Sequence, residues 1–313
     1  MVGQKAAQEE DREWVVAYYD LLGIKQEMRD WSNPRSTRDK IAEFRSMLTH
    51  PLLSAINRNL DKRSRNKPDI TKTRECEFRT FGFADTMVIA SPLVNRFGVP
   101  QPMALSILLT TMLPLSAGLL ENGILFRAGV ELGIAQAIRP VADYFTMPDR
   151  TAPPLEYGRF SEGDIAGPAY IAAHDLASRS GSPPGMFVGQ AAVALLNEAA
   201  NGNGRFRDAW APNAKQALGL LMRLESKNGF NVTPDGDVWA VDFARLEATG
   251  ANSRDPTYRK TQESLRAGYG WVLNELKRDR QDNVRQKFLW LKNYLEGRGI
   301  SGSSPRSRTS PDT

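Results

Sequence analysis

The chain has 313 residues, of which 41% are hydrophobic, and a formal net charge of +5 at pH 7. This length and hydrophobic content are enough for one large domain or two ordinary ones, each with a hydrophobic core. The positive balance favours acidic partners, such as a nucleoside triphosphate, RNA or an anionic membrane surface. Cys76 is the only cysteine, which excludes an internal disulfide and indicates a reducing compartment. One cysteine and two histidines also exclude an ordinary zinc site.

The basic runs of the chain are typical of solvated loops rather than of a nucleic-acid interface. They lie at Lys62–Lys67 and in the tail after Arg298. The first residues are polar and do not form a signal peptide. The longest apolar stretch, from Met103 to Leu120, contains Ser106 and Pro114 and predicts a buried helix rather than a membrane span. We therefore expect a soluble, cytoplasmic protein with no membrane or nucleic-acid partner.

Hydrophobic patterns in the first half of the chain alternate between strand and helix periods. The expected order is strand, helix, two strands, helix and strand. This order predicts an α+β fold of the ferredoxin-like or palm-like kind, with a βαββαβ core sheet and helices on one face. The predicted elements are a strand from Trp14 to Tyr19, a helix from about Ser36 to Leu60 with a break at Pro51, a hairpin between Glu75 and Ser91, a helix from Val99 to Leu120 and a strand from Ile124 to Gly133.

The second half is expected to be mainly helical. Arg139 to Gly163 predicts a loop, Gly167 to Ser178 a short helix, and Met186 to Val188 an edge strand. Helices follow, interrupted by a hairpin turn at Pro234–Asp237, and one or two more lie between Thr257 and Leu295. The predicted organisation is a flexible N-terminus (1–12), a main domain (13–190), a mainly helical extension that packs on the core (191–299) and a disordered tail (300–313).

Two aspartates are the strongest candidates for chemistry. Asp20 and Asp85 each follow a short apolar run that predicts a buried strand. A carboxylate in such a place is costly unless a counter-charge neutralises it, and Mg²⁺ or Mn²⁺ does so well. Taken singly, each aspartate is better explained as a helix cap or a turn residue. As a pair on neighbouring strands, they predict a site for divalent ions and, through the ions, for a polyphosphate.

Four segments, in order, resemble the motifs of the class III nucleotidyl cyclases, the adenylyl and guanylyl cyclase catalytic domains. They are Tyr19–Ile24, Phe83–Asp85, Arg127–Gly133 and Asp164–Gly167. The nearest look-alikes are bacterial stand-alone cyclases, including the pyrimidine cyclases of Pycsar antiphage defence. With that subgroup the chain shares a Gly-Pro-Ala helix start at Gly167 and a Lys-x-x-Trp-Leu segment that begins at Lys287.

The resemblance implies a role for each residue of the predicted site. Asp20 and Asp85 would hold two Mg²⁺ or Mn²⁺ ions, together with the backbone carbonyl of Leu21. Backbone N–H groups would cradle the β- and γ-phosphates, and Lys25 and Arg127 would add positive charge. Those N–H groups belong to Leu22, Gly23 and Ile24.

The base of the nucleotide is expected to contact Phe81 and to donate a hydrogen bond to Asp164. The purine-reading Lys of adenylyl cyclases would fall at Phe81, which favours a pyrimidine and hence UTP or CTP as the substrate. The family's transition-state Asn and Arg would fall at Ile171 and Asp175, with Arg159 or Arg179 as possible replacements.

Because the family's sites form between two catalytic domains, the resemblance implies a head-to-tail homodimer. The product would be a 3′,5′-cyclic mononucleotide second messenger, read by a downstream effector protein in bacterial defence or signalling.

Several of the residues named above also have an alternative, purely structural explanation. Arg127 is as easily explained by a pair with Glu131 or another buried carboxylate, and Asp164 by a turn. Phe81, Trp290 and Leu291 suit a packed core, and His174 suits a half-buried helix position. The alternative functions are a degenerate cyclase-like nucleotide-binding dimer, then a palm-type or diguanylate cyclase, for which a Gly-Gly-Asp-Glu-Phe hairpin is missing, and last a nucleic-acid-binding protein.

Overall fold

The computed structural model describes residues 12–23, 35–48, 79–83, 85–92, 101–138, 164–178, 184–202, 211–224, 238–249, 254–278 and 280–301. The strands are β1 (Arg12–Leu21), β2 (Arg79–Phe83), β3 (Thr86–Pro92), β4 (Phe126–Ile138), β5 (Asp164–Ala166), β6 (Gly185–Val188), β7 (Leu221–Leu224) and β8 (Val238–Val241). The α-helices are residues 35–48, α3 (Gln101–Glu121), α4 (Pro168–Ser178), α5 (Gln190–Ala200), α6 (Ala211–Gly219), α7 (Pro256–Leu276) and α8 (Asp282–Gly297), with a 3₁₀ turn at Leu246–Thr249.

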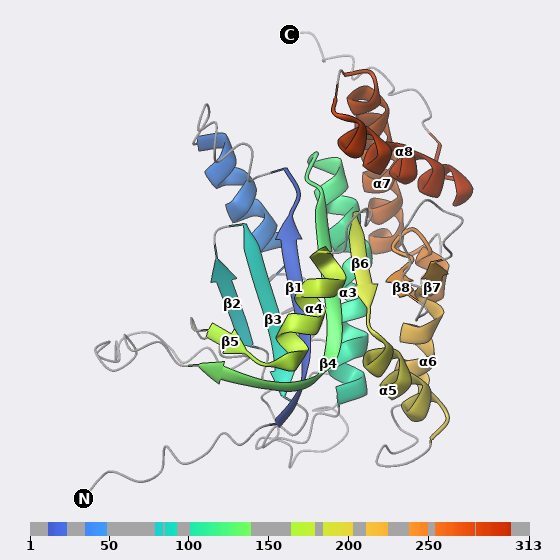
Figure 1. Cartoon of the computed structure of the whole chain (residues 1–313). Helices are drawn as coiled ribbons and strands as arrows, with labels where there is room; N and C mark the ends of the chain where they lie inside the picture. Colours follow the sequence, from blue (N-terminus) through green and yellow to red (C-terminus); the bar gives the residue numbers. More distant parts are fainter. Residues whose placement is uncertain are drawn as a thin grey trace, which may run out of the picture.

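One eight-stranded sheet organises these elements, in the order β2-β3-β1-β4-β6-β8-β7, with β5 paired to β4 (Figure 1). β1 lies antiparallel between β3 and β4, and β2 lies antiparallel to β3. The helix at residues 35–48 connects β1 to β2, and α3 connects β3 to β4. This is the β-α-β-β-α-β order of a ferredoxin-like core, so the α+β prediction is confirmed.

Alternation along β1 divides its side chains between two cores. Val15 and Tyr19 join the large cluster that includes α3, whereas Val16 and Tyr18 join a second cluster with α4. Asp20, by the same two-residue period, belongs to the α4 face. Helices therefore cover both faces of the sheet, with α4 in front and α3 behind in Figure 1. The expectation of helices on one face was wrong, because the short Ala-rich α4 packs directly on the strands.

Helix α3 is the apolar segment that the sequence predicted to be buried. Its stretch Ala104–Glu121 is long and apolar enough to cross a membrane, but 72% of it is buried inside the protein. Its two threonines are satisfied within the helix, since the Thr110 hydroxyl donates to the Ser106 carbonyl at 2.8 Å and the Thr111 hydroxyl to the Leu108 carbonyl at 2.9 Å. The Ser106 hydroxyl donates to the Asn213 carbonyl at 3.2 Å, and the buried Ser116 hydroxyl has no partner among the described residues. α3 is thus explained as a core helix that packs between the sheet and α7.

The sheet extends further than the sequence indicated. β6 is not an edge strand, because it lies between β4 and β8 and all four of its residues are buried. β4 continues beyond Gly133 to Ile138, and β7 was not expected. The sheet therefore runs across the domain boundary expected at residue 190. The expected loop at 139–163, the turn at Pro234–Asp237, the helix beyond residue 48 and the two terminal segments outside 12–301 lie outside the described residues.

Two glycines of β4 offer a matched test of the contact with α4. A Cβ on Gly129 would lie 2.0 Å from the Ala173 carbonyl oxygen, whereas one on Gly133 would lie 3.5 Å from the Ala169 Cβ, an ordinary contact. We expect Gly129→Ala to lower the free energy of unfolding by about 2–3 kcal/mol, because α4 must shift. Gly133→Ala should change it little. Chemical denaturation measures both, and equal stability of the two variants would contradict this packing.

Candidate active site

Asp20 and Asp85 meet at one end of the sheet. Asp20 is the penultimate residue of β1, and Asp85 occupies the turn that joins β2 to β3. The register places Asp20 opposite Thr86, and the Leu21 N–H donates to the Asp85 carbonyl at 3.1 Å. Both residues are buried, with exposed fractions of 3% and 7%. Backbone pairing therefore holds the two residues at adjacent positions of the sheet end.

Each carboxylate keeps one oxygen without a hydrogen-bond partner among the described residues. These buried atoms are Oδ1 of Asp20 and Oδ2 of Asp85. A buried, unpaired carboxylate oxygen costs free energy, so that its presence calls for a ligand. Divalent cations with a preference for oxygen ligands meet this need. Asp20 and Asp85, which the sequence singled out, therefore each offer one buried oxygen that a divalent cation could bind.

Arg127 supplies the counter-charge of Asp20. Its Nε and Nη2 atoms donate to the Asp20 Oδ2 at 3.1 and 2.9 Å, across the register pair of β1 and β4. Glu131 does not take part. Its carboxylate accepts from the backbone N–H groups of Leu132 at 2.9 Å and Ala192 at 3.3 Å, at the start of α5. The alternative of a pair with a buried carboxylate is therefore observed, with Asp20 rather than Glu131 as the partner.

The donor set limits the kind of metal site. Among the described residues there is no group of three or more His, Cys, Asp or Glu side chains that could hold an ion. Mg²⁺ binds in proteins through one or two carboxylates, and substrate phosphates and water complete its coordination. Asp20, Asp85 and the Leu21 carbonyl fit that open type of site, in which water or a bound phosphate compound would complete the coordination.

The expected phosphate cradle is only partly described. The Leu22 N–H donates to the Leu125 carbonyl at 2.9 Å, so the pairing beyond the ends of β1 and β4 already uses the amide that was expected to bind phosphate. Gly23 follows with a φ of +88°, and a Cβ there would meet nothing within 4 Å. A positive φ favours glycine and leaves the backbone open to close approach. Ile24 and Lys25 lie outside the described residues.

Of the two residues expected to contact the base, Phe81 lies in the hairpin that carries Asp85, and Asp164 lies at the other end of β4. Phe81 is 2% exposed and packs with Val16 and Val88 in the α4-side cluster, which supports its structural interpretation. Asp164 begins β5, opposite Ile138, the last residue of β4, whereas Arg127 is near the first. At about 3.3 Å per residue these positions are roughly 35 Å apart along the strand. The chain therefore does not bring its own Asp164 to its own Asp20.

Helix α4 presents no positive charge at the two positions compared with the family. Ile171 is 57% exposed, and the exposed Asp175 carboxylate oxygen Oδ1 lies 3.2 Å from the His174 Nδ1. The His174 ring packs edge-on against Tyr18, with centroids 5.0 Å apart. The Tyr18 hydroxyl lies 3.5 Å from the Thr86 hydroxyl, beside Asp20, and burial raises its pKa. His174 is thus a half-buried helix residue, as expected.

Sequence reasoning missed one cation near the carboxylates. Lys287 of α8 is half-buried. Burial lowers the pKa of its ammonium group, the charge of Arg127 lowers it further, and the charge of Asp20 opposes both. Lys287 therefore lies within electrostatic reach of the Asp20–Arg127 pair. Its sequence signal was the Lys-x-x-Trp-Leu segment that begins at Lys287, to which the family resemblance gave no role.

Comparison with known proteins gives similarity at the level of structures only. No family model matches the chain, and no curated protein matches its sequence. The adenylyl cyclase CyaB from P. aeruginosa is similar at 11% identity and a TM-score of 0.41, covering 74% of this chain and 94% of that one. The guanylyl cyclase Cya2 is similar at 10% identity and a TM-score of 0.35, covering 74% and 93%. A bacterial light-regulated adenylyl cyclase is similar at 10% identity and a TM-score of 0.41, covering 85% and 60%. With TM-scores below 0.5, the fold assignment rests on the strand order and packing described above.

Thermal unfolding tests the metal pair without any substrate. Mg²⁺ or Mn²⁺ should raise the Tm of the native chain by several degrees, because ions at about a hundredfold over Kd stabilise a protein by about 2.7 kcal/mol. Asp85→Asn should abolish this rise and should increase the Tm of the metal-free protein, since it removes a buried, unpaired charge. Potassium chloride at matched ionic strength is the control. An equal rise in the native chain and the Asp85 variant would contradict the site.

Proposed function

We propose that the protein is a metal-dependent nucleotidyl cyclase, which converts a nucleoside triphosphate to a 3′,5′-cyclic mononucleotide and pyrophosphate. The observation that carries the proposal is the pair of unpaired, buried carboxylate oxygens on Asp20 and Asp85, at adjacent positions of one sheet end. The similarity of four ordered segments to class III cyclase motifs supports the same reaction.

The described residues of the candidate site each have a part in the proposed cyclisation. Asp20 and Asp85 would hold two Mg²⁺ or Mn²⁺ ions, which when bound lower the pKa of the 3′-hydroxyl and neutralise the triphosphate. Arg127 fixes the position of the Asp20 carboxylate through its two hydrogen bonds. Gly23 lets the phosphates approach the backbone closely. The 3′-oxygen bonds to the α-phosphorus while the bond to the β-phosphate oxygen breaks, so that pyrophosphate leaves and the hydroxyl proton is released.

The proposal includes a head-to-tail homodimer. Asp164 is at the far end of β4 from Arg127, so a base contact by Asp164 has to come from a second copy of the chain. The exposed faces of α4 and β4 carry two large apolar side chains, Ile171 at 57% and Ile134 at 48% exposure. Burial of these side chains against a second copy would favour such a dimer.

A pyrimidine triphosphate, UTP or CTP, is the proposed substrate, and antiphage defence signalling in a bacterial cytoplasm is the proposed setting. Both rest on the sequence resemblance to the Pycsar cyclases and on the absence of the purine-reading Lys at Phe81. The buried position of Phe81 leaves the base pocket to other residues.

Incubation with each of the four ribonucleoside triphosphates and Mn²⁺, followed by mass analysis, tests the reaction. We expect a cyclic mononucleotide and pyrophosphate, with UTP or CTP as the best substrate. Asp85→Asn should reduce product at least a hundredfold, roughly the effect of losing a metal-held charge. Asp39→Asn, at an exposed helix position, is the matched control and should retain activity. An active Asp85 variant would refute the site.

Mixing two inactive variants tests the shared site. Asp20→Asn and Asp164→Asn should each be inactive alone, because every site of the dimer then lacks one group. In a random mixture, mixed dimers keep one intact site, so activity should return to about a quarter of the native value. Because Asp20→Asn leaves Arg127 without its partner, its Tm must be checked first. No recovery by two folded variants would exclude the shared arrangement.

A catalytically degenerate, nucleotide-binding dimer that acts as a sensor is the second candidate. It is favoured by the exposed Ile171 and Asp175 on α4, where the family resemblance calls for Asn and Arg. Nucleotide binding without pyrophosphate release from any of the four triphosphates would support this candidate over the enzyme.

A further inference from the structure

Helix α8 is fixed to the core by a buried polar contact. The Tyr294 hydroxyl donates to Asp242 at 2.7 Å and accepts from the Ala244 N–H at 2.9 Å. Arg298 forms an ion pair with the same Asp242, which is 1% exposed. The Tyr294 ring also packs on Phe243, with centroids 4.8 Å apart. These contacts therefore attach α8 to the end of β8.

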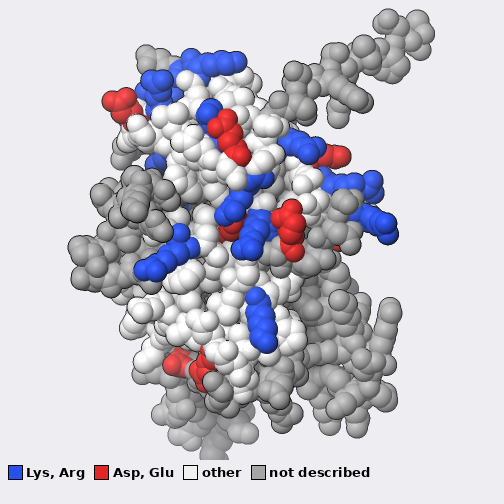
Figure 2. All heavy atoms as spheres, turned by 90° about the vertical axis from the view of Figure 1, so that its right-hand side faces the viewer, with Lys and Arg blue, Asp and Glu red and all other residues white. Residues whose placement is uncertain are grey.

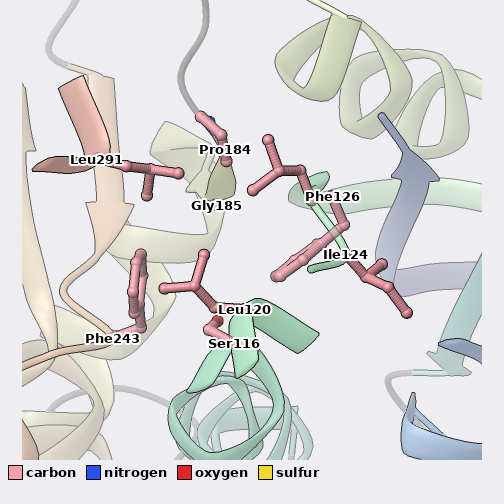
Figure 3. A pocket seen from close by; sticks show the side chains of 9 residues that line it. Ser116, Leu120, Ile124, Phe126, Pro184, Gly185, Phe243 and Leu291 are labelled. Carbon is pink, nitrogen blue, oxygen red and sulfur yellow. The ribbon is translucent and has the colours of Figure 1, made fainter. Parts of the chain in front are cut away.

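One residue of α8 reaches the sheet end that carries the candidate site. Leu291 points into an apolar cavity with Phe126, Gly185 and Phe243 on its walls (Figure 3). Phe126 precedes Arg127 on β4, and Gly185 is the register partner of Arg127 on β6. Figure 1 shows α8 beyond the same end of the sheet, where β1 ends and β6 begins. The cavity thus places Leu291 of α8 at the sheet end where Phe126 precedes Arg127.

Lys287 stands one helical turn before Leu291, on the same face of α8. It is half-buried, and none of the described acidic side chains lies within ion-pair distance of it. Arg127, which is close enough to lower the pKa of Lys287, already uses its Nε and Nη2 atoms on Asp20. Lys287 therefore has no carboxylate partner among the described residues, and an anion would stabilise its half-buried ammonium group.

Elsewhere on the side of the molecule formed by α6 to α8, positive side chains are accompanied by negative ones. Figure 2 shows Lys and Arg side chains interspersed with Asp and Glu over the side of the molecule where α6 to α8 lie. Lys292, on the same helix, pairs with Glu296 at 2.8 Å. The excess positive charge at Lys287 is therefore local to the candidate site rather than part of a basic surface for nucleic acid.

We propose that Lys287 binds the phosphates of the nucleotide held at Asp20 and Asp85, within the same chain. This inference rests on the proposed function and extends it, since it makes α8 a wall of the substrate site. An ammonium group is a flexible point charge that suits the non-reacting phosphates. Arg127 and Lys287 would also balance the two carboxylates, so that the charge of the metal ions remains for the triphosphate.

Binding of inorganic triphosphate with Mg²⁺, measured by calorimetry, tests this contact without any turnover. Lys287→Met should raise the Kd by roughly ten- to a hundredfold, the usual effect of losing a hydrogen bond to a charged group. Lys287→Arg should restore most of the affinity. Lys292→Gln is the matched control on the same helix and should bind as the native chain does. The Tm of each variant checks that α8 stays in place.

The outcomes separate this inference from the proposed reaction. Unchanged triphosphate binding by a folded Lys287→Met variant, or no binding by the native chain with Mg²⁺, would overturn the role of Lys287 even if cyclisation occurs. Lys287-dependent binding with no cyclic product from any nucleoside triphosphate would support the phosphate contact while refuting the cyclase. A raised KM for the nucleotide with little change in kcat is the expected kinetic result for Lys287→Met.

Discussion

A charge taken out of water at the end of a strand is the constraint on which this structure depends. Asp20 is 3% exposed, and its cost is met on one oxygen by Arg127 and on the other by nothing in the described part of the chain. Asp85, one backbone hydrogen bond away, also has a buried carboxylate oxygen without a partner in the described part of the chain. Such an arrangement persists only where the surrounding structure enforces it, and unsatisfied groups of this kind concentrate at functional sites.

The sheet supplies that enforcement. Asp20 continues the alternation of β1, whose neighbouring side chains are locked in two cores, so the strand cannot slip without moving apolar residues to the wrong face. α3 closes one face with its buried apolar length, and α4 closes the other through the close approach of Ala173 to Gly129. A strand holds Asp20 in place with less freedom than a loop would allow, and the Leu21 hydrogen bond ties the Asp85 turn to the same strand.

The C-terminal part of the chain belongs to the same body. β7 and β8 extend the sheet, and the buried Asp242 beside them fixes Tyr294 and Arg298 of α8. A segment that the sequence presented as a helical extension thereby brings Lys287 within electrostatic reach of Arg127. The positive charge around the site thus has contributions from residues far apart in the sequence.

The sequence by itself determined the elements whose signals are local. The spacing of apolar residues predicts the buried helix α3, and the turn residues predict the hairpin that carries Asp85. The charge of Asp20 after an apolar run marks the end of β1. Only the tertiary structure decided which groups meet. Strand register and sheet order decided three findings: Asp20 pairs with Arg127, the Leu22 amide donates to Leu125, and β6 lies inside the sheet. These depend on contacts between distant segments, for which no short stretch of sequence carries a signal.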